Sequence, residues 1–337
     1  MDPDPHSPPA RATGRGPGWY RGDLHVHSRA SSGGELTPPQ LAAEARRLGL
    51  DFLATTEHAG AQTHDQWHPL AADDLLVVLG QEVTTHTGHW LALGLPPGRT
   101  VAWDYGIRDT AEPSLDGQLA TVRGWGGTSV VAHPYAPYPS GTFMYPYEGF
   151  DAVEVWNGAW DSDVPWQADN ETALAEWGRE LAAGVHRGRW RPAVGNSDAH
   201  LAGQLGLPHT VVWAAELSTA AILSGIRAGR SWIAESGEVE VSFTVTGHDG
   251  RSAGVGERLA APRDAPVVAR VEVRGVPGGV VSFHTERGTV HREPLPEGGA
   301  GAVEWGTSAE EAGFVRVEVR HPDGRMAALT NPVLVGG

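Results

Sequence analysis

Short apolar runs alternate with stretches of helical periodicity through the first two-thirds of the chain. The runs that predict strands are Asp51–Thr56, Leu75–Val83, His89–Gly94, Thr128–Ala132, Ala152–Trp156 and Pro192–Gly195. Apolar residues recur every three or four positions, and so predict helices, over Pro39–Leu48, Asp169–Ala183 and Glu216–Ala228. This alternation predicts an α/β fold with parallel strands, arranged either as a barrel or as a layered sheet.

The pattern changes at about Gly237. Beyond it, turns rich in Gly, Pro and Asp separate apolar or alternating runs that include Val239–Thr246, Val267–Arg274, Val280–Thr285 and Phe314–Arg320. Several such runs within about 100 residues are typical of an antiparallel β-sandwich. We therefore predict a disordered tail over 1–18, which is rich in Pro, Gly and charge, an α/β domain over 19–236, and a small all-β, sandwich-like domain over 237–337.

Composition removes several classes of function. The net charge is −16 and the basic residues form no cluster, which argues against a nucleic-acid partner. The chain has no Cys and no Lys, so thiolate catalysis, Cys-based zinc sites and Schiff-base chemistry are excluded. Residues 1–18 lack the apolar run that is typical of a signal peptide, and the sequence contains no apolar run of the roughly 18 residues that would span a membrane. We expect a cytoplasmic protein with a small-molecule substrate and no membrane partner, and leave its oligomeric state open.

Residues able to bind metal recur at the ends of the predicted strands. They are His25, His27, His58, Glu82, His89, His133, Asp198 and His200. Their position at the carboxyl ends of many different strands favours a barrel, because α/β barrels build their sites at that end. Alternate residues of a strand point to the same side, so His25 and His27 can reach one ion. Nitrogen and oxygen ligands without sulfur suit Zn, Mn or Fe, and their number indicates two or more ions, with Glu82 as the natural bridging carboxylate.

Five segments together resemble a known family. They are Gly22–Ser28 (GDLHVHS), Thr56–His58 (TEH), Gly80–Glu82 (GQE), Ala132–Pro134 (AHP) and Ser197–His200 (SDAH). Their order and spacing over residues 19–236 resemble the polymerase-and-histidinol-phosphatase (PHP) domain. Val153–Asn157 (VEVWN), Gly229–Trp232 (GRSW) and the C-terminal β region are more similar still to its carbaryl-hydrolase-like (CehA/McbA) branch. The resemblance implies a distorted (β/α)7 barrel with a centre of two or three metal ions.

The resemblance also implies which residues would hold each ion. One metal would be held by His25, His27, Glu82 and Asp198; a second by Glu82, His89 and His133; and a third would receive His58 and His200. The family usually has an Asp where this chain has Ser32, so the third site departs from the pattern. Glu35 lies close in sequence and is the residue that could replace the missing ligand, which leaves the number of ions at two or three.

Other polar residues near these motifs are expected to support the chemistry. Asp23 and Glu57 are candidates to fix the tautomers of ligand histidines, with a turn or salt-bridge role as the alternative for Asp23. His200 would act as the general acid if its metal site is empty. Arg29 could contact an anionic substrate, although a solvated surface role is the simpler interpretation. Asn157 follows a predicted strand end, which suits either a substrate-binding role or a turn.

The sequence therefore predicts a metal-dependent hydrolase in which a metal-bridging hydroxide attacks the substrate. We expect a phosphoesterase that acts on a small molecule. A carbamate, ester or amide hydrolase, as the CehA/McbA resemblance implies, uses the same hydroxide and is the alternative. A carbohydrate- or protein-binding module with a relic metal site is an alternative of another class, suggested by the β region and the 13 Trp residues.

Overall fold

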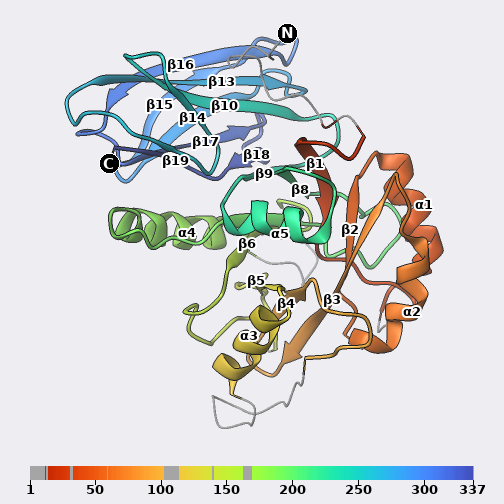
Figure 1. Ribbon diagram of the computed structural model, residues 1–337. Coiled ribbons are helices and arrows are strands. Elements are labelled where there is room, and N and C mark those ends of the chain that lie inside the picture. The colour runs from red at the N-terminus through yellow and green to blue at the C-terminus, as the bar shows by residue number, and fades with distance from the viewer. Residues whose placement is uncertain are drawn as a thin grey trace.

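The first part of the chain forms a mixed, curled sheet (Figure 1). The computed structural model describes residues 12, 14–30, 33–58, 60–101, 114–138, 140–161 and 169–336. The strands of the curl pair in the order β1 (Gly18–Asp23), β2 (Phe52–Thr55), β3 (Leu76–Thr85), β4 (Gly88–Leu93), β5 (Thr128–Ala132), β6 (Ala152–Asn157) and β7 (Ala193–Asn196). Strands β1 to β3 are parallel, as are β5 to β7, whereas β4 is antiparallel to both of its neighbours.

The two ends of this curl meet beyond β1 and β7. Val26 forms a parallel bridge with Ala199, and the His27 N–H donates to the Ala199 carbonyl at 3.0 Å. Close by, the Thr210 hydroxyl of β8 (His209–Ala214) donates to the Gly195 carbonyl of β7 at 2.7 Å. The curl therefore places the segments that follow β1 and β7 side by side, although they are more than 150 residues apart in the sequence.

The predicted mixed α/β class is confirmed. The expectation of parallel strands is wrong for β4, because a tight turn rather than a helix joins it to β3. In this turn the Thr85 hydroxyl donates to the Gly88 carbonyl at 2.7 Å, and Gly88 has a φ of 125° that favours glycine. The distorted (β/α)7 barrel implied by the resemblance stays a prediction.

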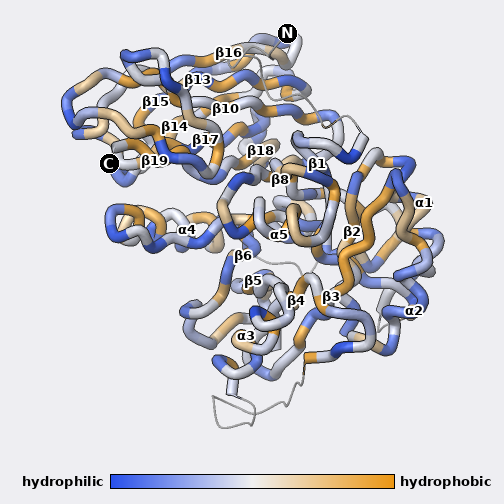
Figure 2. Tube along the Cα trace, in the orientation of Figure 1, coloured by the Kyte–Doolittle hydropathy of each residue, from blue (hydrophilic) through white to orange (hydrophobic). Residues whose placement is uncertain are grey.

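Helix α1 (Pro38–Leu48) anchors the segment beyond β1. The Thr37 N–H donates to Gln40 Oε1 at 2.9 Å at the start of the helix, and Gly49, with a φ of 70°, ends it. Leu41 on its apolar face packs in one buried cluster with Val26. Figure 2 shows hydrophilic and hydrophobic residues alternating along α1, whereas β2 beside it is mostly hydrophobic. This packing holds the backbone that carries His25 and His27.

Further helices surround the sheet. They are α2 (His64–Trp67), α3 (Leu115–Gly124), α4 (Asn170–Gly184) and α5 (Thr219–Arg227), with short 3-10 turns η1 (Gly60–Thr63), η2 (His68–Leu70) and η3 (Val185–Arg187). In the described part of the chain, every helix is too short or too polar to cross a lipid bilayer. Most of the predicted tail lies outside the described residues; residues 14–17 lead directly into β1, and Arg15 donates to the Leu217 carbonyl.

The C-terminal strands continue the main sheet. Strand β9 (Ser231–Ala234) pairs with β8 on one side and with β18 (Met326–Thr330) on the other. The extension also contains β12 (Arg258–Leu259), β14 (Val280–Thr285), β15 (Gly288–Pro294), β17 (Phe314–Arg320) and β19 (Val333–Val335), and a separate sheet contains β10 (Glu240–Gly247), β11 (Ser252–Gly254), β13 (Pro266–Arg274) and β16 (Gly301–Ser308).

The separate sheet and the extension share one apolar core. Phe243 and Val271 of the separate sheet pack in the same cluster as Phe283 and Val317 of the extension. Because the extension belongs to the main sheet, the C-terminal strands are tied to the α/β part by backbone hydrogen bonds. The predicted domain boundaries and the sandwich-like domain stay predictions.

Candidate metal centre

Four side chains from three separate segments meet at one point. His25 Nε2 lies 3.1 Å from His27 Nε2, 3.3 Å from Asp198 Oδ1 and 3.5 Å from Glu82 Oε2. His27 Nε2 lies 3.1 Å from the same Asp198 oxygen and 3.2 Å from the same Glu82 oxygen. In a tetrahedral site, metal–ligand bonds of about 2.0–2.2 Å place neighbouring ligand atoms about 3.4 Å apart. These atoms therefore have the spacing that one ion requires.

Glu82 divides its two carboxylate oxygens between separate groups of histidines. Its Oε2 atom faces His25 and His27 and lies 2.7 Å from His58 Nε2. Its Oε1 atom lies 2.9 Å from His89 Nδ1 and 3.1 Å from His133 Nε2. Glu82, His89 and His133 are close enough to bind a second ion. This division of oxygens is the arrangement that a bridging carboxylate needs.

A third group contains His27, Asp198 and His200. His200 Nδ1 lies 3.5 Å from Asp198 Oδ1 and donates to the Asp198 carbonyl at 2.8 Å. His58, predicted to share this site with His200, instead faces Glu82. Ser32 lies outside the described residues. The Glu35 carboxylate accepts from the Ala202 N–H at 2.9 Å, and within the described residues it joins none of the groups that could hold an ion.

Charge is balanced within this buried cluster. Burial alone would raise the pKa of Glu82, but the charges of His25, His89 and His58 hold it well below its usual range. Burial would likewise lower the pKa of His25, but neighbouring carboxylates, Asp198 first among them, raise it well above its usual range. The carboxylates are therefore ionised beside the imidazoles, and ionised carboxylates at this spacing are also what a divalent cation would need as ligands.

His200 lies at the more accessible side of the cluster, with 30% of its side chain exposed. Burial and the charge of His27 lower the pKa of His200. A lowered pKa favours the neutral imidazole, the form that binds a metal ion. The role of His200 as a metal ligand, and as a general acid if its site is empty, stays a prediction.

Glu154, on β6, is the most connected side chain behind the cluster, and the sequence reasoning gave it no role. Its Oε1 atom accepts from His25 Nδ1 at 3.1 Å and from Asn196 Nδ2 at 2.8 Å. Its Oε2 atom accepts from the His133 N–H at 2.9 Å and from Asn157 Nδ2 at 3.0 Å. Because the carboxylate accepts from Nδ1 of His25, the Nε2 lone pair of His25 is directed at the cluster.

Asp23 and Glu57, predicted to fix histidine tautomers, have other partners. Asp23 accepts from the Gly206 N–H at 2.9 Å, the Ser197 N–H at 3.2 Å and the His25 N–H at 3.3 Å. Burial raises the pKa of Asp23 to about 6. It therefore connects the backbones of two segments rather than orienting an imidazole.

Glu57 accepts from the Ser28 N–H at 3.1 Å, from the Ser28 hydroxyl and from Trp67 Nε1 at 3.0 Å. These bonds fix the chain after His27. The carboxylate that meets a ligand imidazole from behind is Glu154, so the expected role of Glu57 belongs to a residue on a different strand.

Two residues were predicted to bind substrate. Asn157 is buried, and its Nδ2 atom donates to Glu154 at 3.0 Å and to Asp198 Oδ2 at 3.4 Å. Its amide is therefore directed at the protein's own carboxylates. Arg29 is exposed to solvent, which fits the simpler interpretation of a surface residue.

Two of the candidate ligands have a backbone conformation that side chains other than glycine rarely adopt. The φ angle is 50° at Asp198 and 23° at His133. Such residues each cost of the order of 1–3 kcal/mol and cluster at functional sites. At Asp198, the Ala199–Val26 bridge and the bonds from Asp23 to the neighbouring Ser197 fix the backbone on both sides.

Tyr138 lies beside the group formed by Glu82, His89 and His133. Its ring centroid is 6.0 Å from that of His89 and 6.3 Å from that of His133. Burial, together with the charges of Glu82 and Asp198, raises the pKa of Tyr138 well above its usual value. Its phenol therefore keeps its proton at neutral pH. The sequence offered no signal for this residue beyond its place in the loop that follows His133.

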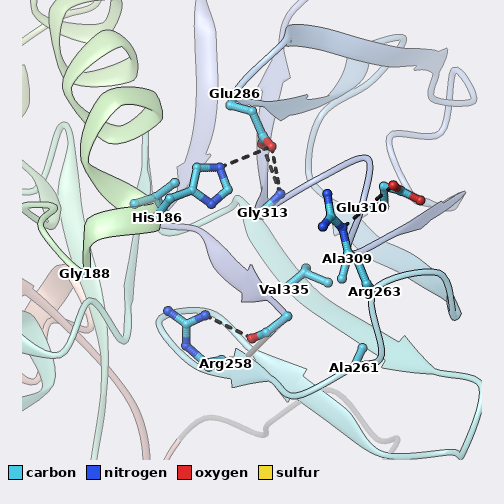
Figure 3. Close-up of a pocket in the computed structure, with 12 residues that line it drawn as sticks. His186, Gly188, Arg258, Ala261, Arg263, Glu286, Ala309, Glu310, Gly313 and Val335 are labelled. Atoms are coloured by element: carbon cyan, nitrogen blue, oxygen red, sulfur yellow. Dashed lines mark hydrogen bonds and ion pairs between the residues drawn. The ribbon is translucent and has the colours of Figure 1, made fainter.

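A separate cavity of about 620 Å³ lies where η3 meets the C-terminal strands (Figure 3). His186 Nε2 lies 3.6 Å from Glu286, whose carboxylate also accepts from the Gly313 N–H at 3.0 Å. Arg263 and Glu310 form a further pair at 3.8 Å on its wall. Among the described residues, the predicted site residues do not line this cavity, so it is distinct from the metal centre.

Comparison with known proteins gives one family match. Residues 179–231 match the PHP-associated family. No curated protein matches the sequence significantly. The matched segment contains Asp198 and His200.

The solved structures that are similar to this chain include the following two. One is a protein from Bifidobacterium adolescentis, provisionally described as a metal-dependent phosphoesterase, at 19% identity and a TM-score of 0.39 over 58% of this chain and 89% of the other. The other is an amidohydrolase from Chromobacterium violaceum with bound sulfate and no metal, at 18% identity and a TM-score of 0.38 over 54% and 88%. The family match over residues 179–231 supports the resemblance to the PHP superfamily, and the CehA/McbA branch stays a prediction.

Proposed function

We propose that the protein is a metal-dependent hydrolase with two divalent ions, Zn, Mn or Fe, and that it acts on a small-molecule phosphoester. One observation carries the proposal: the two oxygens of Glu82 face two groups of histidines, and Asp198 completes the first group at ligand spacing. The resemblance to the PHP domain, and its distorted (β/α)7 barrel, agree with this function.

The side chains around Glu82 would have two roles, to hold the ions and to orient the ligands. When bound, the two cations lower the pKa of a water molecule and polarise the substrate oxygen. His25, His27 and Asp198 would hold the first ion, His89 and His133 the second, and Glu82 both. Behind them, Glu154 would keep the His25 imidazole in the tautomer that binds metal.

Charge favours a substrate that the cations themselves attract. The chain carries a net charge of −16, so an anionic phosphoester would be repelled from the surface unless bound cations reverse the local field. A phosphoesterase of this kind should therefore lose substrate affinity, and not only turnover, when its metal is removed.

The test is elemental analysis of the purified protein followed by a substrate panel. We expect roughly two ions per chain and hydrolysis of 4-nitrophenyl phosphate that EDTA abolishes. Glu82→Gln should lose both the bound ions and the hydrolysis. Glu176→Gln, which alters a half-buried carboxylate on α4 paired with Arg179, is the matched control and should retain both the ions and the activity.

Three results would overturn parts of the proposal. Fewer than one ion per chain after loading would remove the dinuclear centre. Hydrolysis of an aryl carbamate or ester, with no phosphatase activity, would assign the alternative substrate class. Binding of glycans by a protein that hydrolyses nothing in the panel would assign a binding module.

A further inference from the structure

Tyr138 lies on a loop whose own hydrogen bonds determine its shape. The Ala136 N–H donates to the His133 carbonyl at 2.9 Å, and the Phe143 N–H donates to the Pro134 carbonyl at 2.9 Å. Within this loop the Gly141 N–H donates to the Tyr138 carbonyl, also at 2.9 Å. The loop is thereby closed at its base and across its tip, so the ring starts from a defined backbone position.

Gly141 is what allows the ring to lie in this position. A Cβ atom at residue 141 would come within 2.5 Å of the Tyr138 ring, which real Cβ atoms do not tolerate. The ring therefore packs on the bare backbone of Gly141 and is held beside His89 and His133, with centroid separations of 6.0 and 6.3 Å.

The phenol differs from its neighbours in chemistry. The cluster otherwise consists of imidazoles and carboxylates that suit metal binding, whereas a phenol has an ordinary pKa of about 10 and donates a hydrogen bond at neutral pH. Within the part of the chain that the structure describes, no hydrogen bond engages the Tyr138 hydroxyl. A donor held beside a candidate metal group is suited to an oxygen on a bound substrate.

We propose that Tyr138 is a catalytic residue of the hydrolysis proposed above, whose hydroxyl donates a hydrogen bond to the substrate oxygen that gains negative charge as water attacks. The proton stays on the phenol throughout, so Tyr138 stabilises charge and transfers none. The inference rests on the proposed function, and it adds to the ligand set a residue that contacts the substrate.

The test compares Tyr138→Phe with Tyr147→Phe. Tyr147 belongs to the same loop but lies against Arg191, at 5.8 Å from its ring centroid, and serves as the matched control. Removing one preorganised donor to a charged substrate oxygen costs roughly 100-fold in kcat. We therefore expect that loss on 4-nitrophenyl phosphate for Tyr138→Phe, and wild-type kinetics for Tyr147→Phe.

A second readout does not depend on turnover. Inorganic phosphate titrated calorimetrically into the metal-loaded protein presents the same kind of oxygen, so Tyr138→Phe should weaken its binding about tenfold, which is the scale of one charge-assisted hydrogen bond. Metal content, measured by elemental analysis, should stay at the wild-type ratio. A Tyr138→Phe protein that loses metal would show that the residue is structural, and the inference would be wrong.

The remaining outcomes separate this inference from the proposed function. If the wild-type protein hydrolyses the phosphoester and Tyr138→Phe equals it in kcat and phosphate affinity, the role of Tyr138 is refuted while the hydrolase stands. If the wild-type protein hydrolyses nothing, yet Tyr138→Phe weakens phosphate binding, the contact with an anion stands and the proposed function fails.

Discussion

Glu154 offers the sharpest test of how the centre is built. Its carboxylate accepts four hydrogen bonds, two on each oxygen, from His25, Asn196, the His133 N–H and Asn157. Glu154→Gln keeps the shape of the side chain but replaces one oxygen by an amide group, which can only donate. Whichever way the amide turns, two N–H donors then face another N–H group.

The size of the effect follows from these contacts. A buried donor that loses its acceptor costs about 1–3 kcal/mol, so the apo protein, with two such donors, should lose roughly 2–6 kcal/mol of unfolding free energy. Partners behind a metal ligand contribute about 10- to 100-fold in metal affinity. We expect that range for the first ion, because the His25 tautomer is no longer fixed, and this corresponds to about 1.4–2.7 kcal/mol.

The assay is competition for Zn²⁺ with a chelator of known affinity, beside urea unfolding of the metal-free protein. The matched control is Glu286→Gln, which alters a partly buried carboxylate that accepts from the Gly313 N–H at 3.0 Å in the C-terminal region, away from Arg320. It should lower stability and leave metal affinity unchanged. Wild-type Zn²⁺ affinity in Glu154→Gln would refute the reasoning that this carboxylate orients His25.

Three further predictions address other parts of the molecule. Glu82→Gln should bind less than one ion per chain by elemental analysis, because both groups share this carboxylate, whereas loss of a single ion would show that it does not bridge. Glu35→Gln should keep the wild-type metal ratio, because its carboxylate bonds to the Ala202 N–H; a fall in the ratio would place Glu35 at a third ion. Burial, reinforced by the charge of Arg316, lowers the pKa of His284 to about 4. The unfolded chain therefore binds the extra proton first, and stability should fall by about 3 kcal/mol as the pH drops from about 6.5 to 4; urea titrations should show a flatter pH profile for His284→Gln.

Features encoded by neighbouring residues could be predicted from the sequence. Helix α1 begins within one residue of its predicted start, because Thr37 and Gln40 supply the first-turn hydrogen bond and Gly49 supplies the left-handed end. Strand β5 has the predicted bounds, since its apolar run is short and stands between Gly and His-Pro. The contact between His25 and Asp198 could also be predicted, because both residues follow strand ends and the ends of parallel strands converge.

Features that depend on distant partners could not be predicted. Glu154 looks like any acid within a strand, and its role is set by His25, which is 129 residues away. Asp23 and Glu57 stand next to candidate ligands in sequence, yet their carboxylates turn to backbone N–H groups and to Trp67. Proximity in sequence was therefore a poor guide to which carboxylate meets which imidazole. The direction of β4 was hidden for a related reason, since it depends on the turn at Gly88.

The change of sequence pattern near Gly237 suggests two domains. Side chains after Gly237 nevertheless bind residues before it, and these contacts lead to the metal centre. Arg320 of β17 binds both oxygens of Glu171 at 2.6 and 3.2 Å, and it lies over the Trp160 ring at 5.3 Å. Trp160 in turn donates to Glu171 at 2.9 Å. The C-terminal region thereby holds Glu171 in the first turn of α4 and Trp160 beyond the end of β6.

The start of α4 is also where the turn beyond β6 is held. Asn170 accepts from the Asn157 N–H at 2.9 Å and donates to the Trp160 carbonyl at 3.3 Å, while the Asn157 side chain donates to Asp198. An unbroken series of contacts therefore runs from a C-terminal arginine to a candidate metal ligand. A change in hydropathy pattern marks where one kind of secondary structure replaces another, but only the paired groups decide whether two parts act as one. Here the pairing of β9 with β18 and the contacts of Arg320 favour a metal centre whose geometry depends on the C-terminal strands.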